Sequence, residues 1–231
     1  MKYFPDSGFA SASSAGPQRE QPRDWLVWHF THLENLEPIV KEGHLLCPER
    51  KLPAVSVALH GVKERRRHLM VAPDDQYPAR KSVADHVPFY IAARSPMLFT
   101  VTRGHDNYSG GDTDLVFLGL SIGAIEDSGV TWCASDSNAA CTIVEFSRKV
   151  DNIGQLVDYD LLCQKWWGKT PDDQNRPSRR AAEVLVLDTV PLEMITHVVA
   201  KTQVTLDKAR DRLTSVGGVR EYHVLPSFYY N

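Results

Sequence analysis

The pattern of apolar and polar positions along the chain predicts an α+β domain. Continuous apolar runs are typical of strands that are buried on both faces. Such runs, or shorter ones bounded by turn residues, are found at 25–30, 87–92, 114–122, 181–190, 195–200 and 220–226. Few helical periods lie between them, and strands do not alternate regularly with helices. The pattern therefore favours an α+β fold over repeated βαβ units.

One helix is predicted directly after the first strand, and its start can be read in two ways. Thr31 fits a capping box, but Pro38 would then lie inside the helix at a cost of about 3 kcal/mol. With Asn35 as the cap, Pro38 falls in the first turn, where its missing N–H costs little. We expect this second start, with Leu36, Ile39 and Val40 facing the core and Gly43 ending the helix.

The chain divides by composition into an arm and one domain. Residues 1–24 are rich in Ser, Gly, Pro and Ala and contain few large apolar side chains. Such a segment buries too little surface to offset its ordering, so we expect a flexible N-terminal arm. Residues 25–231 are long enough for a single domain. Within it, residues 146–180 are polar and rich in loops.

Composition and charge exclude several classes of protein. No apolar run approaches the roughly 20 residues of a membrane span, and the first residues lack the pattern of a secretory signal. The four cysteines form no CxxC pair, so we expect reduced thiols and a cytoplasmic protein. A net charge of -3 argues against a broad basic surface for nucleic acid, although it allows a local basic groove.

His29 and Thr31 lie two positions apart on the first predicted strand and so share one of its faces. A buried polar face needs partners, which a bound ligand could supply. The alternative is a capped helix start with no ligand. His29 and His32 make a weak metal site, because no third ligand lies at a recognisable spacing. We expect no metal.

Glu183 stands at the entrance to an apolar strand that is expected to be buried. A carboxylate there is costly unless it is paired or used. It forms either an ion pair with Arg179 or Arg180, or a catalytic group on a rigid strand beside a polar loop.

A basic cluster, Arg65–Arg67, also has two readings. It is either a solvated helix face or a clamp for a pyrophosphate, to which arginine offers a planar fork of donors. No GxGxxG or phosphate-binding P-loop follows a strand, and no GxSxG elbow is present.

Several motifs in this order resemble the DarT family of DNA ADP-ribosyltransferase toxins. They are WHFTHLENL, VKERRRHLM, DHVPFYIAARSPMLF, YSGG, RRAAEVLV and the tyrosine-ended C-terminus. The match covers nearly the whole chain after residue 24. The N-terminal arm and TWCASDSNAA resemble the actinobacterial branch, which modifies thymidine. The resemblance implies an ADP-ribosyltransferase-like split mixed β-sheet with flanking helices, which binds NAD without a Rossmann loop.

The resemblance also implies roles for single residues. His29 and Thr31 match the pair that lines the nicotinamide end of NAD, and Leu46 matches a contact on the adenosine side. Pro38 stands where relatives commonly carry glycine, and because proline has no N–H it is a weaker contact.

Two further matches concern the chemistry. Arg66 matches an arginine beside the pyrophosphate and the target base, and Glu183 matches the catalytic glutamate. An arginine does not lose its proton in proteins. We therefore expect Arg66 to stabilise the developing thymine anion, while the proton leaves through water or Glu183.

The implied acceptor is N3 of thymine, which base pairing occupies in a duplex, so the implied partner is single-stranded DNA. We expect the loop at 146–180 to bind it, with stacking tryptophans and phosphate-contacting cations at Lys165, Trp166, Trp167, Lys169, Arg176, Arg179 and Arg180. The alternative for one tryptophan is the core.

The other implied partner is a DarG-type macrodomain antitoxin, and we expect no membrane and a monomer. Alternatives are an ADP-ribosyltransferase acting on guanine, RNA or protein, and a non-catalytic nucleic-acid-binding module on the same fold.

Overall fold

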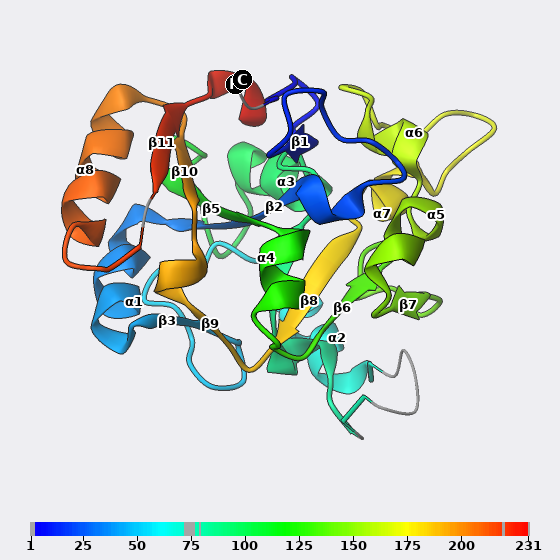
Figure 1. Ribbon diagram of the computed structural model, residues 1–231, viewed down its shortest axis with the longest axis horizontal. Helices are drawn as coiled ribbons and strands as arrows, with labels where there is room; N and C mark the ends of the chain where they lie inside the picture. The colour runs from blue at the N-terminus through cyan, green and yellow to red at the C-terminus, as the bar shows by residue number, and fades with distance from the viewer. Residues whose placement is uncertain (1–2, 72–76, 79, 219, 231) are drawn as a thin grey trace.

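The centre of the molecule is a mixed β-sheet with helices on both faces. The computed structural model describes residues 3–71, 77–78, 80–218 and 220–230. In the main sheet the strand order is β11-β10-β5-β2-β4-β8-β6-β7, and β1 pairs with β2 beside this path. Its strands are β1 (Ala10–Ser11), β2 (Trp25–His32), β4 (His86–Tyr90), β5 (Leu115–Ser121), β6 (Trp132–Ser135), β7 (Phe146–Ser147), β8 (Glu183–Leu187), β10 (His197–Ala200) and β11 (Glu221–Val224). Among these described strands, all pairings are antiparallel except that of β10 with β11 (Figure 1).

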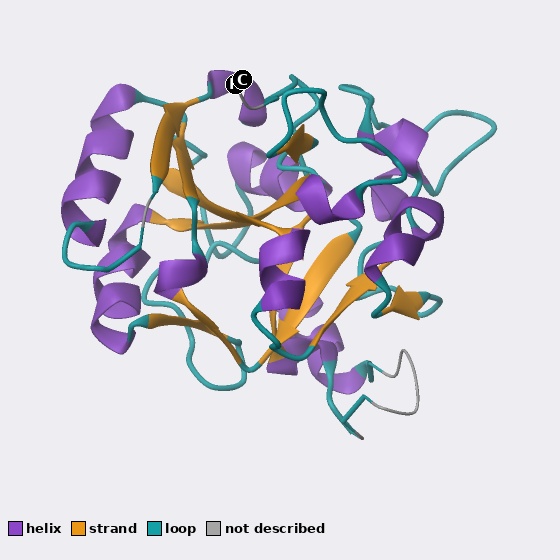
Figure 2. Ribbon diagram, viewed as in Figure 1, coloured by secondary structure: helices purple, strands orange, loops and turns teal. Residues whose placement is uncertain are grey.

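A second, two-stranded sheet joins β3 (His44–Leu46) to β9 (Thr189–Pro191). The α-helices are α1 (Leu36–Glu42), α2 (His60–His68), α3 (Pro96–Arg103), α4 (Ile122–Asp127), α5 (Ile153–Leu156), α6 (Tyr159–Leu162), α7 (Arg176–Arg180) and α8 (Gln203–Leu213). Short 3-10 helices lie at Pro22–Asp24, Leu33–Asn35, Val83–Asp85, Val150–Asn152, Leu192–Met194 and Pro226–Phe228. The mixed sheet with flanking helices, seen in Figure 2, confirms the predicted fold class.

The central strands carry apolar residues on both faces over most of their length, because both faces of the sheet are covered. Trp25 and Val27 of β2 face one core cluster, which takes in apolar side chains of α1, α4 and α8. Leu26 and Trp28 face a second cluster, which includes α3 and the C-terminal residues. Successive side chains of a strand point to opposite faces, so a strand buried on both sides loses its alternation.

The helix after β2 has the predicted bounds, but the predicted cap residue, Asn35, does not cap it. α1 starts at Leu36 and ends before Gly43, whose φ of 73° is the left-handed conformation that favours glycine. Asn35 makes no capping bond within the helix. The preceding 3-10 turn is capped instead by His32, whose Nδ1 accepts from the backbone N–H of Glu34 at 3.2 Å.

The predicted flexible arm is wrong for the residues described between 3 and 24. Strand β1 pairs with β2, and Phe9 is fully buried against the rings of Trp25 and Tyr159. The indole N–H of Trp25 also donates to Gln18 O at 2.8 Å. The few apolar residues of the arm are enough to hold it in place, because they pack against apolar side chains of the domain. Its average composition therefore underestimated how ordered the arm is.

One predicted strand near the site is shorter in the structure. The strand expected at 87–92 ends at Tyr90, and the Ser95-Pro96 break begins α3, with Ser95 Oγ capping Leu98 N. The apolar stretch at 54–59 is a loop. Among the described residues, none of the helices is both long and apolar enough to cross a membrane.

Candidate functional site

One cavity of about 330 Å³ opens beside the end of β2, between α1, β3 and α2. It is lined by all five residues that the sequence predicted as cofactor contacts: His29, Thr31, Pro38, Leu46 and Arg66. These residues come from four separate elements. Cavities of roughly 300–1,000 Å³ are the size class that holds small molecules and cofactors. The fold therefore brings the predicted contacts to a single site.

His29 lines the cavity, and its imidazole ring is neutral. Its Nδ1 lies 2.9 Å from Pro88 O, and because a carbonyl oxygen only accepts, Nδ1 carries the proton. Burial lowers the pKa of His29 below its usual value, against the opposing effect of the Pro88 carbonyl. The ring is thus held in one tautomer, with Nε2 left as an acceptor for an amide or hydroxyl of a ligand.

Thr31 shares that face of β2 and is fixed by a buried asparagine. Asn35 Nδ2 donates to Thr31 Oγ1 at 3.0 Å and to Val55 O at 2.8 Å. Asn35 Oδ1 accepts from Val55 N at 2.8 Å. One side chain therefore joins the strand, the helix start and the loop at 51–58 that closes the cavity. Sequence reasoning saw Asn35 only as a cap.

The chemical centre of the site is a buried ion pair between Arg66 and Glu183. Arg66 Nη1 and Nη2 donate to Glu183 Oε1 and Oε2 at 3.1 and 3.0 Å, a two-bond fork. Glu183 is fully buried and Arg66 is 8% exposed. Burial lowers the pKa of Arg66, but the Glu183 carboxylate raises it by more, so the net pKa lies above the usual value. The expected ion-pair alternatives for Glu183, with Arg179 or Arg180, are wrong.

The backbone and a neighbouring strand hold Glu183 in place. Its Oε1 also accepts from Ala139 N at 3.2 Å, and its backbone N–H donates to Ser135 Oγ at 3.2 Å. Tyr90 lies opposite it in the β4–β8 register and also lines the cavity. Burial and the Glu183 charge both raise the pKa of Tyr90, so its phenol stays neutral. Oε2 accepts only from Arg66 among the described residues. Because Glu183 is fully buried, a ligand hydroxyl reaches Oε2 only where the Arg66 guanidinium moves aside.

The basic cluster on α2 splits between the cavity and the surface. Lys63 and Arg66, three positions apart on one helix face, both line the cavity. Burial, and next to it Arg67, lowers the pKa of Lys63. Arg67 pairs instead with Glu49 and Glu64, at 2.6 and 2.5 Å. The solvated-face reading thus fits Arg67, whereas Arg66 lies at the cavity, where the clamp reading stays a prediction.

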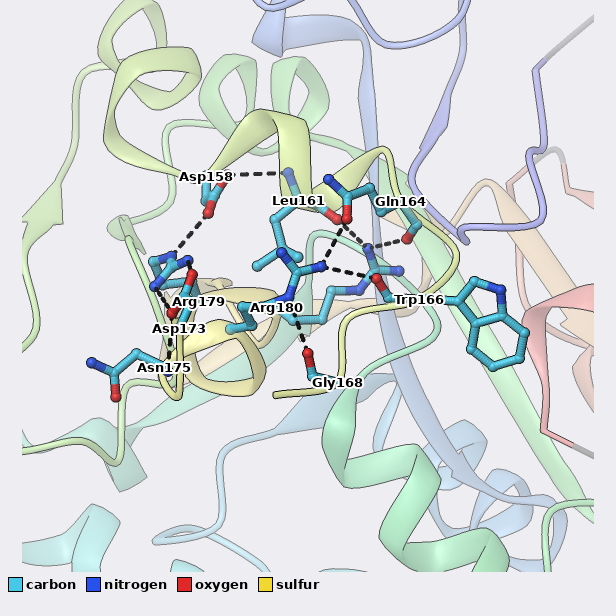
Figure 3. Close-up of polar contacts among 10 residues, drawn as sticks. Asp158, Leu161, Gln164, Trp166, Gly168, Asp173, Asn175, Arg179 and Arg180 are labelled. Atoms are coloured by element: carbon cyan, nitrogen blue, oxygen red, sulfur yellow. Dashed lines mark hydrogen bonds and ion pairs between the residues drawn. The ribbon is translucent and has the colours of Figure 1, made fainter. Parts of the chain in front are cut away.

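Within the segment predicted as a loop at 146–180, residues 158–180 comprise α6, α7 and the loop between them, and we call this part the loop at 158–180. It is cross-braced by its own charges, as Figure 3 shows. Arg179 pairs with Asp158 at 2.9 Å and with Asp173 at 2.6 Å. Arg176 donates to Gly168 O, Gln164 Oε1 and Trp166 O, at 3.0, 2.7 and 3.1 Å. Both guanidinium groups therefore shape the loop, which weakens their predicted role as phosphate contacts.

Arg180 is a correction to the predicted phosphate contacts. It is fully buried, and burial lowers its pKa to about 10. Its guanidinium donates to the carbonyl oxygens of Arg94, Leu161, Leu162, Gln164 and Ser7. No phosphate reaches a side chain that is enclosed in this way. The sequence could not show this, because a doublet of arginines after a proline looks like surface.

The two tryptophans of the loop differ in how far they are buried. Trp166 is 75% exposed, and its ring points away from the loop in Figure 3. Trp167 is half-buried against the second core cluster, and its indole N–H donates to Tyr230 Oη at 2.9 Å. The alternative that one tryptophan belongs to the core thus fits Trp167. Lys165 pairs with Asp6 at 3.3 Å, and Lys169 is exposed.

Three residues of the site were missed by sequence reasoning. Asn35 and Tyr90 touch the cavity from elements already recognised, and the Ala139 N–H comes from a loop with no distinctive pattern. The signal that could have found Tyr90 was its place in the apolar strand predicted at 87–92, although the pairing of that strand beside Glu183 is seen only in the structure. Backbone donors such as Ala139 N leave no trace in side-chain patterns.

Comparison with known proteins matches most of the chain to one family. The family model described as "ssDNA thymidine ADP-ribosyltransferase, DarT" matches residues 28–230. The chain is 53% identical over 229 residues to a DNA ADP-ribosyl transferase of Mycobacterium tuberculosis (strain ATCC 25618 / H37Rv), with 99% of each covered. It is 28% identical to a DNA ADP-ribosyl transferase of Thermus sp. (strain 2.9), over 80% of this chain and 86% of the relative.

Two solved structures share the fold. Thermus sp. 2.9 DarT in complex with ADP-ribosylated ssDNA superposes with a TM-score of 0.80 at 24% identity, covering 91% of this chain and 97% of that one. The same protein in complex with NAD+ gives a TM-score of 0.76 at 23% identity, covering 91% and 98%.

Proposed function

Because the chain belongs to the DarT family of DNA ADP-ribosyltransferases, we propose that it transfers ADP-ribose from NAD to N3 of thymine in single-stranded DNA. The observation that carries this proposal is that Arg66, which holds the buried Glu183 carboxylate, lines the same cavity as His29 and Thr31. It joins a binding site of suitable size to the charged groups that the chemistry requires.

The cavity residues suit NAD as a co-substrate. His29 Nε2 accepts a hydrogen bond and Thr31 offers a hydroxyl, which together match a carboxamide and a ribose. Lys63 and Arg66 supply positive charge for the pyrophosphate on one helix face. Leu46 and Pro38 add apolar wall for the adenosine side, and Pro38 contributes no N–H. Each of these residues lines the same cavity.

The chemistry needs a negative charge where nicotinamide leaves, because the ribose carbon becomes electron-poor as that bond breaks. Glu183 supplies a charge on a rigid strand, and its Oε2 accepts a hydrogen bond from the ribose 2′-OH once Arg66 shifts from that oxygen on NAD binding. Arg66 stabilises the opposite charge that develops on the thymine ring as N3 loses its proton. Its raised pKa excludes it as the base, so the proton leaves through water or Glu183.

The strand-binding element is the braced loop at 158–180. Trp166 is its exposed aromatic ring and is the residue we assign to base stacking. Lys165 and Lys169 are the exposed cations we assign to phosphates. Arg176 and Arg179 hold the loop in the shape that presents them. Base pairing blocks thymine N3, so a duplex is a poor substrate.

The test is a set of short single strands, each lacking one base, incubated with the protein and NAD and weighed by mass spectrometry. One ADP-ribose unit should be added to every strand except the one without thymine, and the paired duplex should stay almost unmodified. Loss of the product with guanine instead would favour the guanine alternative. Equal reaction of uracil in RNA would contradict the choice of DNA.

A non-catalytic binding module is the second candidate, and the intact Arg66–Glu183 pair argues against it. Release of nicotinamide from NAD by the wild-type protein, lost in Glu183→Gln, separates the two. We further propose a monomeric cytoplasmic toxin, with a DarG-type macrodomain partner that removes the modification. Thermosipho africanus DarTG, solved with ADP-ribose, is similar in fold at a TM-score of 0.64.

A further inference from the structure

Three potential metal ligands meet at the far edge of the main sheet. His197 lies on β10, and Glu221 and His223 lie on the edge strand β11. Their donor atoms all lie within 4.8 Å of one another. The parallel register places His197 opposite Glu221, and Glu221 and His223 are two positions apart on one strand face. Regular strand geometry, not a mobile loop, therefore brings the three together.

One imidazole is already oriented, and the other has a buried nitrogen without a hydrogen bond. His197 Nδ1 lies 2.8 Å from Thr196 Oγ1, the kind of outer contact that fixes a metal-bound ring. His223 Nε2 is a buried atom with no hydrogen-bond partner among the described residues, and it lies 3.4 Å from Glu221 Oε2. A buried nitrogen of this kind is costly unless something satisfies it.

The surroundings enclose the cluster on one side and leave it open on the other. The ring of Phe4 lies 4.8 Å from the His223 ring and 6.1 Å from the His197 ring, centroid to centroid. The Glu221 side chain is 46% exposed at the sheet edge, which gives an ion a route inward. An apolar wall beside a charged ligand strengthens its interaction with a cation.

We propose that His197, Glu221 and His223 form a zinc site. Two imidazoles and one carboxylate are ligands that zinc prefers, with bonds of about 2.0–2.2 Å and water as a fourth ligand. Tetrahedral ligand atoms at those bond lengths lie about 3.3 Å apart, so the cluster must contract. The exposed Glu221 side chain supplies that movement. Magnesium and calcium, which select oxygen ligands, do not fit two imidazoles.

The site is separate from the proposed active site. In the strand order, β10 and β11 form one end of the sheet, and β5 stands between them and β2. Zinc would join the edge strand to its neighbour under Phe4, which belongs to the packed N-terminal segment. Zinc binding would stabilise the β10–β11 edge of the sheet and would not take part in ADP-ribose transfer. From the sequence, where only His29 and His32 were weighed as ligands, we expected no metal.

The experiment uses the untagged full chain, stripped with a chelator and titrated with zinc chloride by calorimetry. We expect one zinc per chain and a melting temperature that rises with zinc concentration, because the ion binds the folded state. Cobalt chloride should give the visible absorption of a tetrahedral site, whereas magnesium chloride should change nothing.

Two substitutions make the test specific. Glu221→Gln keeps the size of an exposed side chain and should weaken zinc binding at least tenfold, and His223→Ala should do the same. His68→Ala, which removes an exposed histidine on α2, should bind as the wild type does. No binding by the folded wild type, or equal loss in His68→Ala, would overturn the proposal and leave a metal-free cluster held by hydrogen bonds.

Discussion

At the scale of single residues, Glu183 has two roles that an experiment can separate. It carries the negative charge proposed for catalysis, and it is the partner of an almost fully buried arginine. Removing one member of a buried pair leaves an uncompensated charge, which costs about 3–5 kcal/mol. Neutralising Glu183 should therefore affect folding as well as transfer.

We predict that Glu183→Gln lowers the transfer rate by about 10²–10³-fold and also lowers the melting temperature. The double variant Arg66→Gln with Glu183→Gln should regain much of the stability, because no charge is left unpaired, but none of the activity. Nicotinamide release and thermal unfolding measure the two effects. Full stability in the single variant would contradict the paired role, and restored transfer in the double variant would contradict the catalytic one.

The buried ring of His86 should make the free energy of unfolding depend on pH. It is fully buried, and burial lowers its pKa to about 4. Its Nδ1 donates to Ser82 O at 2.8 Å, so Nε2 accepts from the Tyr77 hydroxyl. Protonation would turn Nε2 into a donor and place a charge in a buried site, and the Tyr77 hydroxyl would then have to accept instead of donate.

Between pH 6.5 and 4 the unfolded chain binds a proton at this ring and the folded chain does not. The free energy of unfolding should therefore fall as pH drops through that window, by about 3 kcal/mol in all, and change no further from this cause below pH 4. Chemical denaturation of wild type and His86→Gln, which cannot titrate there, measures the difference. Parallel pH profiles would rule out His86 as the source.

At the scale of elements, the sequence predicted the features that local patterns encode and missed those that distant contacts decide. The apolar runs of β2 and β5, and the Pro38 and Gly43 signals of α1, are local and were read correctly. The resemblance placed His29, Thr31 and Arg66 at one site, and they do line one cavity. Arg180 was misread because its acceptors include carbonyl oxygens up to 173 positions away.

The loop at 158–180 offers an element-scale prediction through its two tryptophans. Trp166→Ala should weaken binding of single-stranded DNA by about 1–3 kcal/mol, a factor of roughly 5 to 150, while leaving the melting temperature unchanged. Trp167→Phe is the matched control. It removes the bond to Tyr230 and should cost about 1 kcal/mol of stability.

Fluorescence titration with an oligonucleotide and thermal melts give both quantities, and NAD binding should stay unchanged in each variant. The assignment of Trp166 to stacking fails if its alanine variant binds DNA as tightly as the wild type. It also fails if that variant loses NAD and DNA together, because the substitution would then have disturbed the whole site.

At the scale of the whole molecule, charge limits how DNA is held. The chain carries a net charge of -3, and three of the five cations predicted for the strand-binding loop brace the fold. Lys169 and Lys165, whose ion pair with Asp6 is solvent-exposed, are left for phosphates. Each contact with a single strand contributes a slope of about -0.7 to the plot of log affinity against log salt. Two contacts predict a total slope of about -1.4.

This prediction is tested by measuring oligonucleotide affinity at several salt concentrations, with Lys165→Ala, Lys169→Ala and the double variant beside the wild type. Each single substitution should remove about 0.7 from the slope, and the double variant should bind with little salt dependence. Lys208→Ala, on the distant helix α8, is the control and should keep the wild-type slope. A wild-type slope near -10 would demand an extended basic surface, which a chain with 29 acidic and 26 basic residues does not offer. Affinity would then have to come from phosphates, whereas the proposed site takes it from Trp166 stacking and from the target base in the active site.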